Sequence, residues 1–372
     1  MPFLNDMLDD IEKKKVVREA LNVETTLDID VSKVHKSSNK KLNSRYKFDI
    51  PLIMEMVESE IIGQQQAVKS INDMLEIVRA DITDPRKPLY ISLLLGPTGV
   101  GKTEIVRVLA KALYGDSDEF CRIDMNTLSQ SHYAASLTGA PPGYVGSKEG
   151  TTIIDEDKIE GKAGIPGIIL FDELEKASAE VLQALLNVFD NGLLTVASGE
   201  KTYNFRNSII FMTSNLAANE IQQYEEGQKT FLRKILPRSQ DKRNKYVSKI
   251  VNKKMIEVFS PEFVNRIDNI IIFNWIEEET VHKIIELEIK KLNKRLIKHK
   301  ICIELDCDVI NYIVSDGFDK QFGARSLKRA VRKNIELSIA EHLINSNNYN
   351  EYGEIESYQA ILKNKIITFI KR

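Results

Sequence analysis

Long apolar runs and a signal sequence are both missing from this chain of 372 residues. No segment approaches the roughly 18 continuous apolar residues that a membrane-spanning helix requires. The amino-terminal stretch MPFLNDMLDDIEKKK carries acidic residues where a signal peptide has basic and long apolar regions. We therefore expect a soluble, cytoplasmic protein without a membrane partner.

Cysteine and net charge are also scarce. The three cysteines, Cys121, Cys302 and Cys307, are too few and too scattered for a disulfide framework, which favours a reducing compartment. Cys302 and Cys307 lie among apolar residues without a second cysteine pair, so we interpret them as buried thiols rather than metal ligands. The 52 Lys and Arg nearly balance the 54 Asp and Glu, which gives no global bias toward nucleic acid or an anionic membrane.

The first 50 residues contain little that could form a core. A short amphipathic helix fits residues 3–21, and the polar stretch that follows has no apolar periodicity. This is too little for an independent domain, so we predict that residues 1–50 form a flexible arm or docking segment. A leader without a function is the alternative that the composition leaves open.

From residue 51 onward, helical patterns alternate with short apolar segments. Residues 54–80 predict helices that are broken at Gly63. The predicted strands cover residues 89–95, 167–173 and 207–215. Short apolar strands separated by helices are typical of a parallel sheet covered on both faces. The sequence therefore predicts an α/β fold, with residues 51–273 as its large domain.

A second region begins near Trp275. It contains a long helix with apolar residues at helical spacing, a strand at 300–305, two further helices and a strand-like end. We expect residues 274–372 to form a smaller α+β domain.

A glycine-rich segment follows the first predicted strand and opens a helix. It reads GPTGVGKT and matches the phosphate-binding pattern GxxxxGK followed by Ser or Thr. Its glycines let backbone N–H groups turn inward on phosphate oxygens at the helix N-terminus. Lys102 would then reach the β- and γ-phosphates, and Thr103 would hold Mg²⁺. The predicted nucleotide-binding residues are Gly96, Pro97, Thr98, Gly99, Val100, Gly101, Lys102, Thr103 and Glu104.

Two acids end the second predicted strand. In GIILFDE, apolar residues run into Asp172 and Glu173 at the carboxyl end of the strand, where ligands bind in such sheets. Asp172 is placed to coordinate Mg²⁺ through water, and Glu173 is placed to orient and polarise the attacking water. Either acid alone could cap a helix, but beside the phosphate loop the pair indicates an ATPase that uses ATP and Mg²⁺.

Six motifs occur along the chain in a fixed order. They are the phosphate loop at Gly96–Thr103, GAPPGYVG at Gly139–Gly146, FDELEKA at Phe171–Ala177, MTSN at Met212–Asn215, FSPEFVNRID at Phe259–Asp268 and GARSLKRA at Gly323–Ala330. Together they resemble the C-terminal AAA+ module of the Clp unfoldases, ClpB-type most closely, over about residues 52–372. The resemblance implies an AAA+ P-loop fold with a C-terminal lid domain. It also implies a homo-oligomeric ring, usually a hexamer, with ATP between subunits.

The resemblance assigns roles to single residues. Asn215 looks like the polar sensor of the attacking water or γ-phosphate, although a strand-end residue in a turn has the same pattern. Arg266 matches the arginine finger that reaches the neighbour's ATP, whereas an isolated arginine is more often part of a surface ion pair. Arg325 matches the nucleotide-sensing arginine of the lid. Ile61 and Ile62 match the segment that packs on adenine, and they also suit a core.

The pore loop of the family, whose aromatic tip grips an extended polypeptide, matches Gly143, Tyr144, Val145 and Gly146. Without the family, these residues would be interpreted as a Pro/Gly turn with an exposed tyrosine. The chain departs from the family pattern at Ser136, where an arginine is usual. Residues 151–167, which hold a second pore loop in the family, carry acids in place of its basic cluster.

These features predict an ATP-driven ring that unfolds, disaggregates or disassembles proteins by threading polypeptide through its pore. The residues that would carry hydrolysis are Lys102, Glu173, Asn215, Arg266 and Arg325. The alternative is an ATP-dependent AAA+ switch or a nucleic-acid remodelling ATPase. Between Asn215 and Phe259 there is no Ile-Gly-Phe/Leu-like tripeptide of the kind that docks a peptidase ring, so we expect no peptidase partner.

Partners beyond the polypeptide substrate are expected at two places. Residues 1–50 could recruit an adaptor, because the chain has no other recognition domain. Residues 233–254 hold nine Lys or Arg and one acid, which fits a solvated insertion or a partner contact. Nucleic acid is the least favoured partner there, because only Tyr246 could stack on bases.

Overall fold

The structure, a computed structural model, describes residues 42–129, 153–195, 201–218, 220–221, 223, 240–345, 355–363 and 366–372. These residues divide into two compact units. Unit 1 comprises the described parts of Met1–Val57, Gln66–Leu95 and Thr103–Ile272, and unit 2 comprises those of Glu58–Gln65, Gly96–Lys102 and Phe273–Arg372. The domain boundaries that the sequence suggests, at residues 50 and 273, stay predictions.

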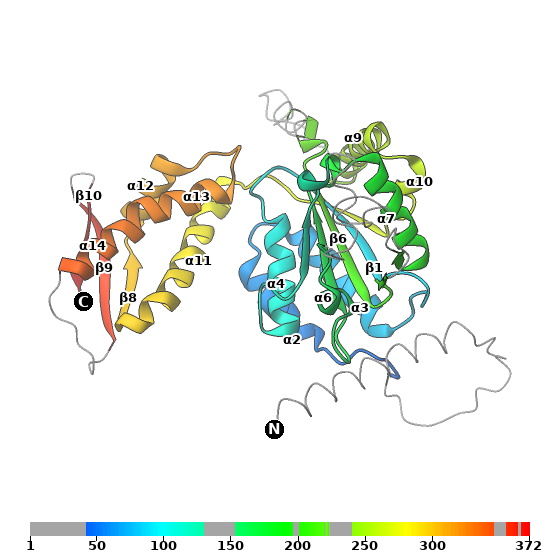
Figure 1. The fold of residues 1–372 in the computed structure, drawn as a ribbon. Helices are drawn as coiled ribbons and strands as arrows, with labels where there is room; N and C mark the ends of the chain where they lie inside the picture. The colour runs from blue at the N-terminus through cyan, green and yellow to red at the C-terminus, as the bar shows by residue number, and fades with distance from the viewer. Residues whose placement is uncertain are drawn as a thin grey trace, which may run out of the picture. The chain divides into compact units, whose positions relative to one another are not determined.

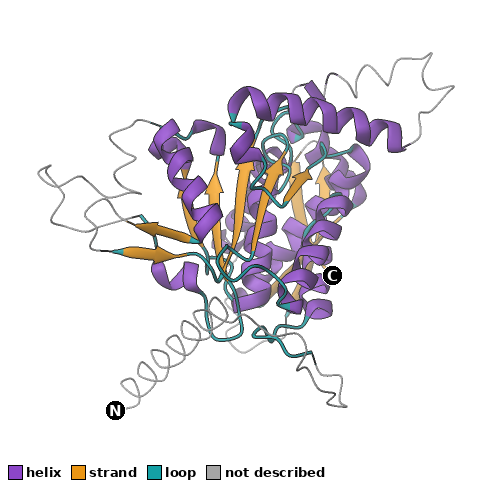
Figure 2. Ribbon diagram, turned by 90° about the vertical axis from the view of Figure 1, so that its right-hand side faces the viewer, coloured by secondary structure: helices purple, strands orange, loops and turns teal. Residues whose placement is uncertain are grey.

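A parallel sheet forms the centre of unit 1, and Figure 2 shows its strands side by side. The strands are β1 (Tyr90–Leu95), β2 (Cys121–Asp124), β3 (Gly167–Asp172), β6 (Ser208–Ser214) and β7 (Asn269–Ile272). They lie in the order β2-β3-β6-β1-β7, and each neighbouring pair is parallel. β1, β3 and β6 are buried at every residue, as expected for strands that are covered on both faces. The predicted α/β fold is thus confirmed.

Helices cover both faces of this sheet, and α4 and α7 lie on opposite sides of its strands (Figure 1). On one face, Leu93 of β1 and Phe171 of β3 share an apolar core with Leu185 and Phe189 of α7 and Phe263 of α10. The helices wholly or largely in unit 1 are α2 (Ile50–Glu60), α3 (Gln65–Ala80), α4 (Lys102–Tyr114), α6 (Glu156–Glu160), α7 (Ala179–Asn191), α9 (Gln240–Val258) and α10 (Pro261–Val264). An antiparallel pair, β4 (Leu193–Thr195) and β5 (Thr202–Asn204), completes the unit.

Unit 2 combines a small mixed sheet with helices that pack on it. Its strands lie in the order β10-β9-β8, with β9 parallel to β8 and antiparallel to β10. Val281 and Ile285 of α11, Ile303 of β8 and Leu327 of α13 share one buried core. The elements are α11 (Glu278–Leu296), β8 (Ile301–Leu305), α12 (Cys307–Gly317), α13 (Ala324–Val331), α14 (Leu337–Asn345), β9 (Glu356–Lys363) and β10 (Ile366–Lys371). The predicted strand-like end is therefore two antiparallel strands.

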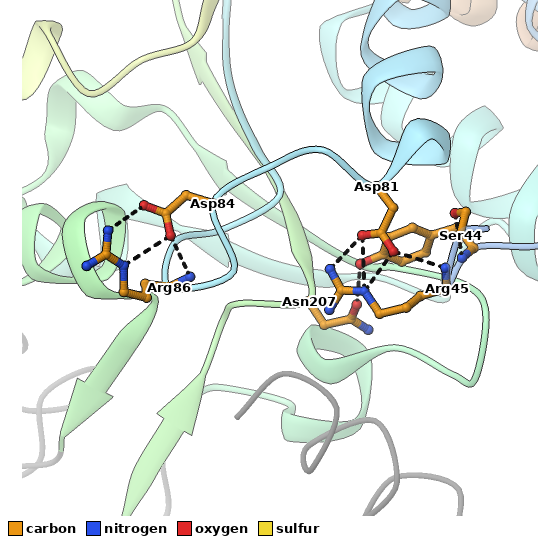
Figure 3. Close-up of polar contacts among 7 residues, drawn as sticks. Ser44, Arg45, Asp81, Asp84, Arg86 and Asn207 are labelled. Atoms are coloured by element: carbon orange, nitrogen blue, oxygen red, sulfur yellow. Dashed lines mark hydrogen bonds and ion pairs between the residues drawn. The ribbon is translucent and has the colours of Figure 1, made fainter. Parts of the chain in front are cut away.

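Residues 44–49, which belong to the predicted arm, pack against unit 1. The Arg45 guanidinium faces the Asp81 carboxylate (Figure 3), with Nη2 2.6 Å from Oδ1 and Nε 2.9 Å from Oδ2. Tyr46 is only 2% exposed, and its hydroxyl donates to Asn207 Oδ1 over 2.7 Å. The Lys47 N–H donates to Gly164 O over 3.0 Å. We call residues 44–49 the strap.

Two further sequence expectations can be compared with the fold. Cys121 is buried and Cys302 is half-buried, but Cys307 is exposed, so its interpretation as a buried thiol was wrong. The reason is that Cys307 is the first residue of α12, where its N–H is bound by the carboxylate of the capping residue Asp306. Among the described residues, no helix combines the length and the apolar character needed to span a bilayer.

Candidate active site

The acids predicted at the end of the second apolar strand lie at the carboxyl edge of the unit 1 sheet. Asp172 is the last residue of β3, and Asn215 directly follows β6, the strand beside it. The phosphate loop directly follows β1, which is the next strand in the sheet. Three adjacent strands therefore end in predicted site residues, as ligand sites in parallel sheets require.

Glu173 has an unusual backbone conformation. Its φ of 58° and ψ of 51° lie in the left-handed region, which is costly for residues other than glycine, asparagine and aspartate. Hydrogen bonds maintain this turn, because the Glu173 N–H donates to Thr213 Oγ1 over 3.0 Å and its carbonyl accepts from Lys176 N over 2.9 Å. The turn re-aims the chain directly after β3. A strained residue held in this way is typical of a functional site.

Both oxygens of the Asp172 carboxylate have partners. Thr213 Oγ1 donates to Oδ1, and Arg122 donates to Oδ2 from Nη2 at 2.6 Å and from Nε at 3.1 Å. Thr213 thereby contacts Asp172 and the Glu173 N–H at the same time. Neither Thr213 nor Arg122 was predicted as a site residue. For Thr213 a signal existed, since it is a hydroxyl residue within a strand that is otherwise largely apolar.

The phosphate loop itself belongs to unit 2. Gly96, Gly99 and Gly101 all have positive φ, so the loop uses glycine where other residues would be strained. A Cβ placed on Gly101 would meet nothing within 4 Å, so there is open space on this side of the loop. Lys102 is buried, and its ammonium donates to the carbonyls of Gly96 at 2.5 Å and Pro97 at 2.8 Å.

These observations fit a bound nucleotide phosphate and its metal. The Lys102 ammonium is aimed at loop carbonyls, a position from which a phosphate oxygen could recruit it. Thr103 and Glu104 lie in the first turn of α4, where the helix dipole favours anions near the backbone. Mg²⁺ is usually held by one or two protein oxygens together with phosphate oxygens and water, and Asp172 and Thr103 offer such oxygens.

The segment expected to pack on adenine also lies in unit 2. Ile61 is 7% exposed, and Ile62 packs against the apolar core of that unit. Gln64, which is 2% exposed, accepts from Asn274 N at 3.0 Å and donates to Asn274 O at 2.9 Å. Gln64 Nε2 also lies 3.4 Å from Val100 O in the phosphate loop. The segment is therefore tied to the loop. Ile62 packs on a core, and its contact with adenine stays a prediction.

Arg325 lies beside the phosphate loop within unit 2. The Ala324 N–H donates to Gly99 O over 2.9 Å. A Cβ on Gly99 would stand 3.6 Å from Arg325 Cγ and only 2.1 Å from Phe322 O, so only glycine permits this approach. The structure thus brings together two residues, Gly99 and Arg325, that are 226 positions apart in the sequence and were both predicted to bind nucleotide.

Arg266 is held in unit 1 by an ion pair. Ser260 caps the short helix α10 by accepting from Phe263 N, and Arg266 lies three residues before the start of β7. Arg266 Nε lies 2.8 Å from Oδ1 of Asp190, which is near the end of α7. The contact is an ion pair without hydrogen-bond geometry, and it uses Nε rather than the two terminal nitrogens. Asp190 was not predicted as a site residue.

Other predictions cannot be placed. The pore-loop residues Gly143, Tyr144, Val145 and Gly146, together with Ser136, lie outside the described residues. Of the basic stretch 233–254, the described part begins at residue 240 and forms most of α9. There, Lys254 pairs with Glu257 at 2.9 Å and Glu220 at 3.2 Å, as in a solvated helix face.

Comparisons with known proteins agree with these features. The family model described as "AAA domain (Cdc48 subfamily)" matches residues 87–270, and the one described as "C-terminal, D2-small domain, of ClpB protein" matches residues 276–356. The chain is 51% identical over 372 residues, all of both chains, to "ATP-dependent protease ATP-binding subunit-like protein AmiB" of Pseudomonas aeruginosa.

Two further relatives are more distant. The chain is 43% identical over 293 residues to "ATP-dependent protease ATP-binding subunit-like protein" of Rhodococcus erythropolis, covering 79% of this chain and 83% of that protein. It is 36% identical over 319 residues to "ATP-dependent Clp protease ATP-binding subunit ClpC" of Staphylococcus aureus, covering 86% of this chain but 37% of that longer protein.

Proposed function

Because this chain belongs to the Clp family of AAA+ ATPases, we propose that it is the motor of a protein-remodelling ring. The chain is an ATPase, and the proposal concerns what its ATP hydrolysis drives. We propose that six chains form the ring and that it threads polypeptide past Tyr144. The threading proposal rests on the sequence Gly143-Tyr144-Val145-Gly146 in a chain of this family.

We assign the chemistry of hydrolysis to the residues of the two units. Lys102 would bind phosphate oxygens, and Thr103 and Asp172 would hold Mg²⁺, directly or through water. When bound, Mg²⁺ neutralises charge that develops on the phosphate oxygens. Glu173 would orient and polarise the attacking water, and its own backbone N–H donates to the Thr213 hydroxyl.

Three further residues complete this proposal. Asn215 would contact the attacking water or the γ-phosphate, and Arg325 would respond to the nucleotide from beside the phosphate loop. Arg266 would act on the ATP of a neighbouring subunit, where such an arginine contributes about 10³–10⁵ in rate. Ile61 and Ile62 would pack on the adenine.

The threading proposal is tested with a folded fluorescent reporter that carries an unstructured tail. Loss of fluorescence with ATP is expected for wild type but not for Glu173→Gln or Tyr144→Ala, while Tyr144→Ala keeps its basal ATPase activity. Tyr246→Ala is the matched control, because Tyr246 is a 45% exposed tyrosine on α9. If Tyr144→Ala unfolds the reporter at the wild-type rate, threading is refuted. If nucleic acid stimulates the ATPase activity of that variant, a nucleic-acid remodeller is favoured.

We also propose that the ring works without a peptidase. The supporting observation is that no Ile-Gly-Phe/Leu-like tripeptide lies between Asn215 and Phe259. The names of the relatives refer to proteases, so degradation must be measured directly. ATP-dependent proteolysis of a tailed reporter, after addition of a peptidase chamber that co-purifies with the protein, would refute the proposal.

We propose that residues 1–41 recruit an adaptor or client. The support is positional, since the strap that follows this segment in the sequence packs on unit 1. Deletion of residues 1–41 is expected to abolish remodelling of the native client. The ATPase activity is expected to stay unchanged. Unchanged remodelling of that client would refute recruitment.

A further inference from the structure

The Asp172 carboxylate is held from two strands of unit 1, and its two oxygens have different surroundings. Oδ1 accepts from the hydroxyl of Thr213, a residue that is 2% exposed. Oδ2 accepts from the guanidinium of Arg122, whose side chain is 45% exposed, whereas that of Asp172 is 12% exposed. The buried partner is thus on Oδ1, and the partly exposed partner is on Oδ2.

Arg122 reaches Asp172 because of the register of β2. Exposure alternates along this short strand, with Cys121 and Ile123 buried and Arg122 and Asp124 exposed. Arg122 is paired with Leu170 of β3, two residues before Asp172. Its side chain leans along the strand toward the carboxyl edge, where both of its donating nitrogens contact Oδ2.

We propose that Arg122 is a positioning residue that competes with hydrated Mg²⁺ for Asp172 and so sets the metal requirement of the ATPase. The inference rests on the proposed function of Asp172. A water bound to Mg²⁺ would donate to the Asp172 carboxylate, and Arg122 already donates to one oxygen of that carboxylate. A guanidinium beside a divalent cation is repelled by it, so metal binding must weaken or displace the ion pair.

Arg122 and Thr213 together orient the Asp172 carboxylate. Two charge-assisted hydrogen bonds to Oδ2, together with the Thr213 hydroxyl on Oδ1, keep the carboxylate in one orientation and compensate its charge. Arg122 lowers metal affinity and preserves the geometry of the site, and both effects depend on its charge.

The test measures metal binding rather than turnover. Free Mn²⁺ is followed by electron paramagnetic resonance while it is titrated into the full chain with a non-hydrolysable ATP analogue. Arg122→Gln is expected to lower the Mn²⁺ dissociation constant by roughly three- to tenfold, the size expected for a unit charge near a divalent ion in a mostly aqueous dielectric. Arg122→Lys keeps the charge and is expected to stay closer to wild type.

Controls separate this role from a structural one. Arg86→Gln removes an exposed arginine that pairs with Asp84 (Figure 3) and is expected to leave Mn²⁺ binding unchanged. If Arg122→Gln does not fold, as judged by thermal unfolding, Arg122→Met provides the uncharged variant of similar length. An unchanged or raised dissociation constant in a folded, uncharged variant would overturn the proposal. A wild-type chain that binds no Mn²⁺ with nucleotide would instead refute the proposed ATP site.

Discussion

At the scale of single residues, Thr213 joins the two acids of the candidate site. Its hydroxyl accepts the Glu173 N–H and donates to Asp172 Oδ1, so one buried oxygen fixes a strained turn and a carboxylate together. Such partners of functional side chains matter because they maintain orientation during the reaction. Asp190 has a comparable position beside Arg266. In the proposed mechanism, both residues would act through a neighbour rather than on the nucleotide.

Thr213→Val is expected to lower kcat for ATP hydrolysis by about 10- to 100-fold, the effect typical of losing an orienting hydrogen bond. The variant also leaves the Glu173 N–H without its partner, which costs about 1–3 kcal/mol of the free energy of unfolding. Steady-state kinetics and thermal unfolding measure the two effects. Thr213→Ser keeps the hydroxyl and should remain near wild type, and a valine variant with wild-type kcat would contradict the positioning role.

Asp190→Asn is expected to lower kcat roughly tenfold without changing nucleotide affinity, because it loosens an arginine that would act on the neighbour's ATP. A double-mutant cycle provides the check. If Asp190 acts only through Arg266, the double variant with Arg266→Ala should be no slower than Arg266→Ala alone. Asp118→Asn, which removes the partner of Arg107 in a more exposed ion pair, is the control. Additive losses in the cycle would argue against the coupling.

At the scale of elements, the strap and the acids lie at opposite edges of one sheet. Asn207, which binds Tyr46, directly precedes β6, and Gly164, which binds the strap backbone, lies shortly before β3. Asp172 and Asn215 are at the carboxyl ends of the same two strands. The strap therefore packs on unit 1 at the edge of the sheet away from these site residues.

The strap predicts how far the amino terminus can be shortened before unit 1 loses stability. Deletion of residues 1–49 removes the buried Tyr46 and should lower the melting temperature below that of a chain that lacks only residues 1–41. Loss of a buried aromatic side chain costs about 3–5 kcal/mol. Differential scanning calorimetry of the two truncated chains, each compared with the full chain, measures the difference. Equal melting temperatures for both truncations would show that the strap does not stabilise unit 1.

The ion pair of the strap also has a defined pH dependence. Burial alone would raise the pKa of Asp81, but the hydrogen bonds and charge of Arg45 outweigh it and lower that pKa. The contribution of the pair is therefore complete above the ordinary aspartate pKa of about 3.9 and is lost as the pH falls through the lowered value. Arg45→Ala should destabilise the chain by about 1–3 kcal/mol near neutral pH, with a difference that shrinks below about pH 4. Arg86→Ala, which breaks the exposed pair with Asp84, should change the melting temperature little at any pH.

At the scale of the whole molecule, the proposed ring makes ATP binding and assembly interdependent. Arg266 would complete a neighbour's site, so a single chain would carry an incomplete ATPase. Glu173→Gln should retain ATP and favour a stable particle of six chains, because it removes the group that activates water but not the groups that bind phosphate. Light scattering with and without ATP measures the mass. A variant that binds ATP yet remains a single chain would contradict the ring.

The local sequence determined the main strands and most of the helices, and it predicts the chemistry of the site. The reason is physical. Burial on both faces of a parallel sheet requires continuous apolar segments such as YISLLL and SIIFMTS, and these can be recognised without the fold. Phosphate binding requires glycines, a lysine and a hydroxyl at fixed spacing in one loop. β2 and β7 were missed because they are only four residues long, and four residues carry too little periodicity.

Only the tertiary structure decided which residues support that chemistry. Arg122 binds Asp172 from 50 positions away, Thr213 binds it from 41 positions away, and Tyr46 binds Asn207 across 161 positions. An arginine, a threonine or a tyrosine at such a position has many potential partners, and no local pattern selects one. Strand order and register make the choice, because they place β2 and β6 on either side of β3 and so bring Arg122 and Thr213 to one carboxylate.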